Sequence, residues 1–197
     1  NHFITLPRLY VIRGETDSNR YIIRNCEATG QSPNSELTER GFAQVQELRD
    51  FLASERIDRV ISSPYLRAIQ TIQPLAEQKN VEIQLDSRLK ERVLSSIPLP
   101  DWIEKLAESF NDLDLAFEGG ESSNQAMNRI TEVVDEIIDN NNLKTTIIVA
   151  HGGIISLLLH HFDNSFGFDE WKRLSNPDVY LLKLTKNKAY FERLWKD

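Results

Sequence analysis

Arginine, serine and histidine side chains stand where the predicted strands of this chain end. Arg13, Ser62-Ser63 and His151 each follow an apolar run, and Arg67 comes shortly after the serines. In an open α/β sheet, ligands bind beyond the carboxyl ends of the strands, so these side chains can converge on one crevice. A phosphoryl group carries close to two negative charges at neutral pH, and planar guanidinium groups bind its oxygens in pairs. The combination favours the binding and transfer of a phosphoryl group.

The glycines after His151 add a second kind of anion-binding group. His151-Gly152-Gly153 joins an apolar run at 145–150 to an apolar helix predicted over 154–161. The amides at the start of a helix stabilise negative charge, so Gly152 is a candidate for binding phosphate. Taken singly, each of these residues has a structural explanation, since a lone arginine is most often a solvated surface residue. Only their combination argues for a site.

The elements that must position these residues alternate along the chain. Apolar β-branched runs predict strands, and apolar residues at helical spacing predict helices. Strands are expected at 4–12, 59–63, 81–85, 145–150, 179–184 and 189–194, and helices after Thr38, at 66–78, around 102–110, after Ser122 and at 154–161. This alternation indicates a mainly parallel sheet covered on both faces, a three-layer α/β/α arrangement. We expect a single domain over residues 1–197, with a cap insertion at about 92–120.

Local signals define the details of this arrangement. Thr38 is a candidate helix N-cap, and Ser122 with Gln125 has the pattern of a capping box. The helix after Thr38 would bury one face, formed by Phe42, Val45, Leu48 and Leu52. Pro74 is expected to disturb or divide its helix. Residues 14–36 are polar and rich in turn formers, which predicts a long loop, and such loops usually have a functional reason.

Five segments resemble, in order, signatures of the histidine phosphatase superfamily, also called the phosphoglycerate mutase-like family. They are Leu9-Tyr-Val-Ile-Arg13-Gly14-Glu15-Thr16 with Asn19, then Ser62–Thr71, Leu89–Arg92, Gly119–Ser122 and Val149–Gly153. The family's opening signature is an apolar strand, then Arg-His-Gly-Glu-Thr, then an Asn three residues further on. Its second signature is Ser-Ser-x-x-x-Arg-Ala-x-Gln-Thr, and its last carries a second histidine. Because the matches keep the family's order over most of the chain, they imply its phosphoglycerate mutase-like fold.

The resemblance also implies catalytic roles. Arg13 and Arg67 would clamp the phosphoryl oxygens, and His151 would hydrogen-bond the group in transfer. Glu91 is similar to the family's proton donor, which would protonate the leaving oxygen and then activate water.

Four further residues would bind the substrate. Asn19 is similar to the family's phosphate-contacting Asn, and Thr16 would help through its hydroxyl or amide. Gly14 belongs to the loop around the phosphate, and Gly152 supplies a helix amide. Neither a metal nor a cofactor is implied, because positioning and arginine charge supply most of the stabilisation of phosphoryl transfer.

The opening segment departs from the family in one respect. Arg13 runs directly into Gly14, so the histidine that would be the covalent nucleophile is not found between them. One hypothesis is that the protein carries this histidine in a modified form, such as phosphohistidine, which a one-letter string can lose. The other is a true deletion, which would leave a phosphate-binding pseudoenzyme. His151 cannot simply take over, because it follows a different strand.

With the nucleophile present, the resemblance implies a phosphomonoester hydrolase that works through a phosphohistidine. Phosphoglycerate mutase activity is the alternative, because cofactor-dependent mutases resemble this chain at Glu91-Arg92. Those mutases usually run longer, with an added insertion near the site, so the compact length of 197 residues favours the phosphatase branch. The expected partner is a small phosphorylated substrate.

The composition limits the other classes of function. A net charge of −7 argues against a general nucleic-acid binder, and a single cysteine, Cys26, excludes an internal disulfide framework. The sequence has no apolar run of the roughly 20 residues that span a bilayer. We therefore expect a cytoplasmic protein without membrane or nucleic-acid partners, for which a homodimer is compatible with the sequence.

Overall fold

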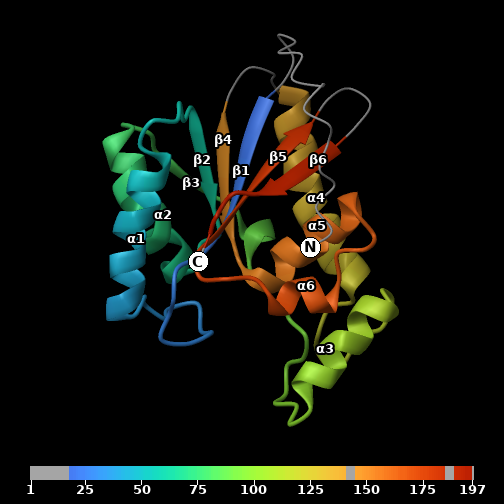
Figure 1. The fold of residues 1–197 in the computed structure, drawn as a ribbon. Helices are drawn as coiled ribbons and strands as arrows, with labels where there is room; N and C mark the ends of the chain where they lie inside the picture. Colours follow the sequence, from blue (N-terminus) through green and yellow to red (C-terminus); the bar gives the residue numbers. More distant parts are fainter. Residues whose placement is uncertain (1–17, 141–144, 185–188, 197) are drawn as a thin grey trace.

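The computed structural model describes residues 18–140, 145–184 and 189–196 of the chain. Within them lies a six-stranded sheet of order β3-β2-β4-β1-β5-β6 (Figure 1). The strands are β1 (Ser18–Arg24), β2 (Arg59–Ser62), β3 (Ile83–Leu85), β4 (Thr146–Ala150), β5 (Asp178–Leu184) and β6 (Ala189–Arg193). The first four pair in parallel, whereas β5 pairs antiparallel with β1 and β6 antiparallel with β5. The prediction of a mainly parallel sheet is confirmed.

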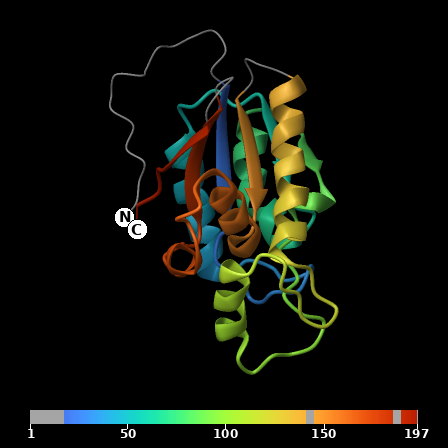
Figure 2. The same ribbon diagram turned by 90° about the vertical axis from the view of Figure 1, so that its right-hand side faces the viewer.

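Helices cover both faces of this sheet. Helices α1 (Glu39–Leu52) and α2 (Leu66–Gln78) lie on one face, and α4 (Ser123–Asn140) and α5 (Gly152–Phe162) lie on the other (Figure 1). Two shorter helices, α3 (Trp102–Asn111) and α6 (Phe168–Lys172), are not part of these two layers. Figure 2 shows α3 and its flanking loops beyond the end of the sheet at which β4 terminates. The three-layer α/β/α fold expected from the sequence is therefore present, with a cap element near the carboxyl ends of the strands.

The core alternates along the central strands. In β1, Ile22 packs with α4 and α5, whereas Tyr21 and Ile23 pack with α1 and α2. Residues Ile147 and Ile148 of β4 divide in the same way and are both completely buried. Because successive side chains of a strand point to opposite faces, one apolar run supplies two cores.

Several local predictions are confirmed. The Thr38 hydroxyl accepts a hydrogen bond from the Gly41 amide and caps α1. Ser122 and Gln125 exchange side chain–backbone hydrogen bonds at the start of α4, as a capping box does. Pro74, in contrast, does not divide its helix as expected, because α2 is continuous from Leu66 to Gln78.

Two expectations were wrong. Residues 18–24 form β1, the central strand, and not part of a loop, because the apolar Tyr21, Ile22 and Ile23 are buried between both helix layers. Phe42 is 47% exposed, so it does not share the buried face of α1. The strand expected at 4–12 lies outside the described residues. Among those residues, no helix combines the length and apolar composition that crossing a bilayer requires.

The central position of β4 generates a stability prediction. Replacing Ile148 by alanine should lower the free energy of unfolding by about 2–5 kcal/mol, because the lost side chain leaves a cavity between sheet and helices. Leu85, which is 56% exposed on the edge strand β3, provides the control, and Leu85→Ala should change stability little. Urea denaturation of both variants measures the difference. Equal losses would contradict this assignment of the core.

Candidate functional site

Three strands end at one edge of the sheet and bring polar side chains together there. β1, β2 and β4 are followed by Asn25, Ser63 and His151 respectively. The Asn25 amide donates to the carbonyl of Ala150 at 3.2 Å, and the Ser63 amide donates to that of Val149 at 2.9 Å. Strand pairing thus continues to the last residue, so the three side chains are held by backbone and not by flexible loops.

A chain of hydrogen bonds joins these side chains. His151 Nδ1 lies 3.1 Å from Asn25 Oδ1, and His151 Nε2 lies 2.8 Å from Ser63 Oγ. All three residues are buried. Asn25 Nδ2 donates to the Cys26 carbonyl at 2.8 Å, which fixes the amide with its oxygen toward the imidazole. Because an amide oxygen only accepts, Nδ1 must carry the imidazole proton and Nε2 the lone pair.

The surroundings keep the imidazole neutral. Burial is the main cause that lowers the pKa of His151 well below its usual 6.5, and the positive charges of Arg67, Arg24 and Arg129 lower this pKa further. A neutral imidazole fits these hydrogen bonds, with Nδ1 donating to Asn25 Oδ1 and the Ser63 hydroxyl donating to Nε2.

Arg24 is the last residue of β1, and its guanidinium lies over the start of α5. Arg24 Nη1 donates to the carbonyls of Leu174 and Ser175 at 3.3 Å each. A Cβ atom on Gly152 would come within 3.0 Å of Arg24 Nε, Cζ and Nη2, so the absence of a side chain there makes room for the guanidinium. Burial is the main cause that lowers the pKa of Arg24, and the nearby carboxylates of Glu91 and Asp178 oppose it.

Arg67 supplies a second guanidinium near the start of α2, and it is more deeply buried than Arg24, with only 2% exposed. Arg67 Nη1 donates to the carbonyls of Gln31 and Ser32 at 3.3 and 2.9 Å. Its Cζ atom lies 5.0 Å from the centre of the Tyr65 ring, and that ring lies 5.1 Å from the His151 ring. Tyr65 therefore connects Arg67 to the imidazole.

Glu91 places a carboxylate at the N-terminus of α5. Its two oxygens accept from the amides of Gly153 at 3.0 Å and Ile154 at 2.8 Å, and Oε1 also accepts from the amide of Arg92 at 2.8 Å. A Cβ atom on Gly153 would lie 2.7 Å from Glu91 Oε1, so glycine permits this close approach. Glu91 thus occupies the amides of the second and third residues of α5, next to the Gly152 amide that the sequence predicts to bind phosphate.

An arginine holds the segment that carries Glu91. Arg129 donates to the carbonyls of Arg88, Lys90 and Glu91, and its other contacts are two hydrogen bonds to the carboxylate of Glu121. The segment is irregular, so these bonds replace the ladder that a strand or helix would provide. A cavity of about 320 Å³ opens beside it, with Tyr65, Glu91 and Arg129 in its lining.

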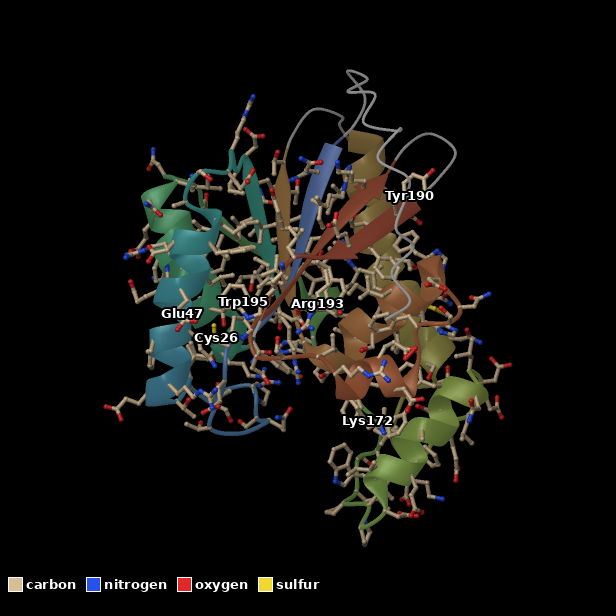
Figure 3. All side chains as sticks on the ribbon, viewed as in Figure 1. Cys26, Glu47, Lys172, Tyr190, Arg193 and Trp195 are labelled. Carbon is tan, nitrogen blue, oxygen red and sulfur yellow. The ribbon has the colours of Figure 1, made fainter. Side chains whose placement is uncertain are left out.

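Cys26 follows Asn25 but has no means to act as a nucleophile. Its side chain is completely buried, and burial raises the pKa of the thiol to about 12. The reactive thiolate is therefore not populated near neutral pH. Figure 3 shows Cys26 on the α1 side of the sheet, where it packs with Leu37 and Val45.

The structure brings together Arg67, Glu91, His151 and Gly152 of the residues predicted from the sequence. It does not bring Asn19 to them. Asn19 lies near the start of β1, paired with Lys183, whereas Arg24 at the other end of β1 pairs with Ala150. Arg13, Gly14 and Thr16 lie outside the described residues.

The sequence analysis overlooked Arg24 and Asn25. The signal was present in Tyr21-Ile-Ile-Arg24-Asn25-Cys26-Glu27, an apolar run followed by Arg and, three residues later, Glu. This spacing equals that of Arg-His-Gly-Glu and needs no deletion. The segment at Arg13, however, has more residues identical to the family's opening signature. In the frame that starts at Arg24, Asn25 stands where the signature has its nucleophilic histidine.

Comparisons with known proteins identify the family and the fold of this chain. The family model of the histidine phosphatase superfamily (branch 1) matches residues 9–197. A probable phosphatase of Schizosaccharomyces pombe is 28% identical over 186 residues, which cover 91% of this chain and 85% of that protein. Phosphoserine phosphatase 1 of Hydrogenobacter thermophilus is 30% identical over 124 residues, 59% of each chain. A phosphoglycerate mutase structure from Bacillus anthracis superposes with a TM-score of 0.73 at 16% identity, over 91% of this chain and 93% of that one.

The buried imidazole generates a prediction about pH. The folded state keeps His151 neutral, whereas the unfolded chain takes up a proton near pH 6.5. Protons therefore favour unfolding, and the free energy of unfolding should fall as the pH is lowered from 7 through 6.5, with a slope that approaches about 1.4 kcal/mol per pH unit. Urea denaturation over about two pH units, from pH 7.5 to 5.5, measures this slope.

The variant His151→Gln isolates this contribution, because glutamine does not titrate. Its overall stability is expected to be lower, but the slope against pH should be shallower than in the wild type. His161, which is exposed, provides the control, since His161→Gln removes an imidazole without touching the buried cluster. An unchanged slope in His151→Gln would show that the imidazole is not the group responsible.

Proposed function

Because this chain belongs to the histidine phosphatase superfamily (branch 1), we propose that it is a phosphomonoester hydrolase. The observation that carries the proposal is the pair of desolvated guanidinium groups, Arg24 and Arg67, next to the neutral imidazole of His151. A phosphoryl group bound between the arginines would be in reach of the buried polar side chains at the ends of β1, β2 and β4.

The electrostatics support binding of a dianion. Burial is the main cause that lowers the pKa of Arg67, and the positive charge of Arg24 lowers it as well, so the two cations are close enough to repel each other. Arginine stays protonated despite such shifts. A phosphomonoester would offset both charges and would accept the directional hydrogen bonds that guanidinium groups donate. Glu91 compensates only part of this charge.

The finer mechanism is constrained by Asn25. An amide nitrogen is not nucleophilic, so a phosphohistidine cannot form at this position, and we do not propose one there. Whether the protein contains an additional histidine between Arg13 and Gly14 is independent of Asn25. The mass of the intact protein answers it, because one further histidine, phosphorylated or not, changes that mass.

Two alternatives use the same site. A protein that binds phosphomonoesters without turnover is favoured by Asn25, since the position of the family nucleophile is inert. Phosphoglycerate mutase activity is favoured by the likeness of the fold to a mutase. The three functions differ in a measurable product: inorganic phosphate, no product, or a phosphoglycerate isomer.

The experiment is a panel of phosphomonoesters assayed for phosphate release, with and without EDTA. We expect release that EDTA does not reduce, because no step of the proposal uses a metal. Inorganic phosphate should also raise the melting temperature, by mass action on the folded state. Arg67→Ala should weaken phosphate binding by about ten- to a hundredfold, as expected for the loss of charge-assisted hydrogen bonds.

Arg40→Ala is the matched control, because the Arg40 side chain is 77% exposed on α1. It should bind phosphate as the wild type does. Stabilisation by phosphate without release would select the binding protein, and conversion of one phosphoglycerate into another would select the mutase. Equal phosphate binding by the wild type and Arg67→Ala would reject the site itself.

The glycine under Arg24 gives a further prediction. Gly152→Ala should push the Arg24 guanidinium aside, because the new methyl would lie within 3.0 Å of it. Phosphate affinity should fall by about tenfold or more, since small misplacements in such sites are costly, whereas stability should change little. Gly167→Ala is the control, because a Cβ atom there meets no atom within 4 Å. Calorimetric titration with phosphate measures both, and equal affinities would contradict the role of Gly152.

A further inference from the structure

Hydrolysis at this site needs an attacking group, and few of the nearby side chains can supply one. Asn25 is an amide, and the Cys26 thiol is kept protonated by burial. Glu91 uses its two carboxylate oxygens to accept three backbone amides. Among the described residues at this site, His151 and Ser63 remain, and the Ser63 hydroxyl is hydrogen-bonded to the imidazole, which places it to be activated as the attacking group.

The hydrogen bonds around Ser63 all have the direction that activation requires. The Tyr65 amide donates to Ser63 Oγ at 3.2 Å, so the hydroxyl accepts on one side and is free to donate on the other. With the proton of the neutral His151 ring on Nδ1, the Ser63 hydroxyl is placed to donate to Nε2, 2.8 Å away. On the far side of the ring, His151 Nδ1 donates to Asn25 Oδ1. A hydroxyl, an imidazole and a side-chain oxygen thus form one line.

Resting on the proposed phosphatase function, we propose that Ser63 is the catalytic nucleophile, that His151 is its general base and acid, and that Asn25 is a positioning residue. The arrangement has the roles of a nucleophile, a base and a group that orients the base. Asn25, which rules out a phosphohistidine at its own position, thereby acquires a function: its oxygen fixes the tautomer that directs the lone pair of Nε2 at Ser63.

The steps balance in atoms and protons. Ser63 Oγ attacks phosphorus, an Oγ–P bond forms and the ester P–O bond breaks. The hydroxyl proton passes to His151 Nε2 and then to the leaving oxygen. Water next attacks the phosphoserine, giving its proton to Nε2, and the P–Oγ bond breaks. Ser63 recovers its proton from Nε2, and inorganic phosphate leaves.

The neighbouring charges suit both steps. Arg24 and Arg67 would hold the phosphoryl oxygens, and the same charges lower the pKa of His151, which makes the imidazolium a good donor to the leaving oxygen. Tyr65 lines the cavity of about 320 Å³ and its ring also contacts that of His151, so a substrate from this cavity would have to pass Tyr65 to reach Ser63. Tyr65, two residues after Ser63, is therefore shared by the lining of the cavity and the contacts of His151.

Trapping the intermediate tests the proposal. The full chain is mixed with p-nitrophenyl phosphate, quenched in acid, and analysed by intact mass and peptide mapping. A serine phosphate ester survives acid, whereas a phosphohistidine, as a phosphoramidate, does not. We expect an acid-stable phosphoryl group on Ser63, and Ser63→Ala should lose the adduct and at least about a hundredfold of the turnover. Ser165→Ala is the control, because Ser165 is exposed and its hydroxyl bonds only to Asp163 among the described residues.

The role of Asn25 is tested by conservative rescue. Asn25→Asp keeps an oxygen that accepts from Nδ1 and should retain turnover within about tenfold, whereas Asn25→Leu removes the acceptor and should lose about a hundredfold. Melting curves of both variants, and of Ser63→Ala, establish that they are folded and still stabilised by inorganic phosphate. Similar turnover in Asn25→Asp and Asn25→Leu would reject the positioning role.

The outcomes separate this inference from the function on which it rests. Turnover that persists in folded Ser63→Ala, or an adduct on His151 that is found only when a parallel sample is quenched in alkali, overturns the role of Ser63 and leaves the phosphatase proposal standing. Stabilisation by phosphate without wild-type turnover overturns both the hydrolysis and the nucleophile, and it leaves a binding protein. Neither binding nor turnover rejects the site as a whole.

Discussion

The pairing of β1 with β4 is the constraint on which the rest of the site depends. Both strands are buried on both faces, so their register is set by two hydrophobic cores at once. That register aligns Arg24 with Ala150 and continues through the hydrogen bond from the Asn25 amide to Ala150. The side chains that follow the strands are consequently placed by the most stable part of the fold, which is how a precise polar arrangement is kept rigid.

Charged side chains lie close together where β1, β2 and β4 end. The guanidinium groups of Arg24 and Arg67 bind backbone carbonyls on one side, and Glu91 occupies the first amides of α5. Gly152 and Gly153 allow this crowding, because any side chain there would meet Arg24 or Glu91. The result is a compact cationic region with a neutral imidazole inside it, which favours a dianionic ligand over a neutral one.

Asn25 changes the chemistry that this fold can perform without changing the fold. The amide accepts a hydrogen bond from the imidazole and so preserves the buried polar cluster that the sheet edge requires. In the frame that starts at Arg24, it also stands where the family signature has its nucleophile. Ser63 then becomes the side chain whose environment most resembles that of an activated hydroxyl, because both of its hydrogen-bonded neighbours leave its proton directed at a base.

The sequence by itself determined the fold class, because the alternation of apolar runs predicted the three layers. Local motifs also predicted Arg67, Glu91, His151 and Gly152, which the structure places near one another. Tertiary structure decided which apolar run is the central strand. Leu9–Ile12 and Tyr21–Ile23 both have the composition of a buried strand. The resemblance to the family signature favoured the first, because Gly14-Glu15-Thr16 follows it. Packing shows that Tyr21, Ile22 and Ile23 are buried between helices that come later in the chain, which the letters alone do not show. The partners of His151 were hidden for the same reason, because Asn25 and Ser63 are 126 and 88 residues away from it in the sequence and meet it only through the sheet.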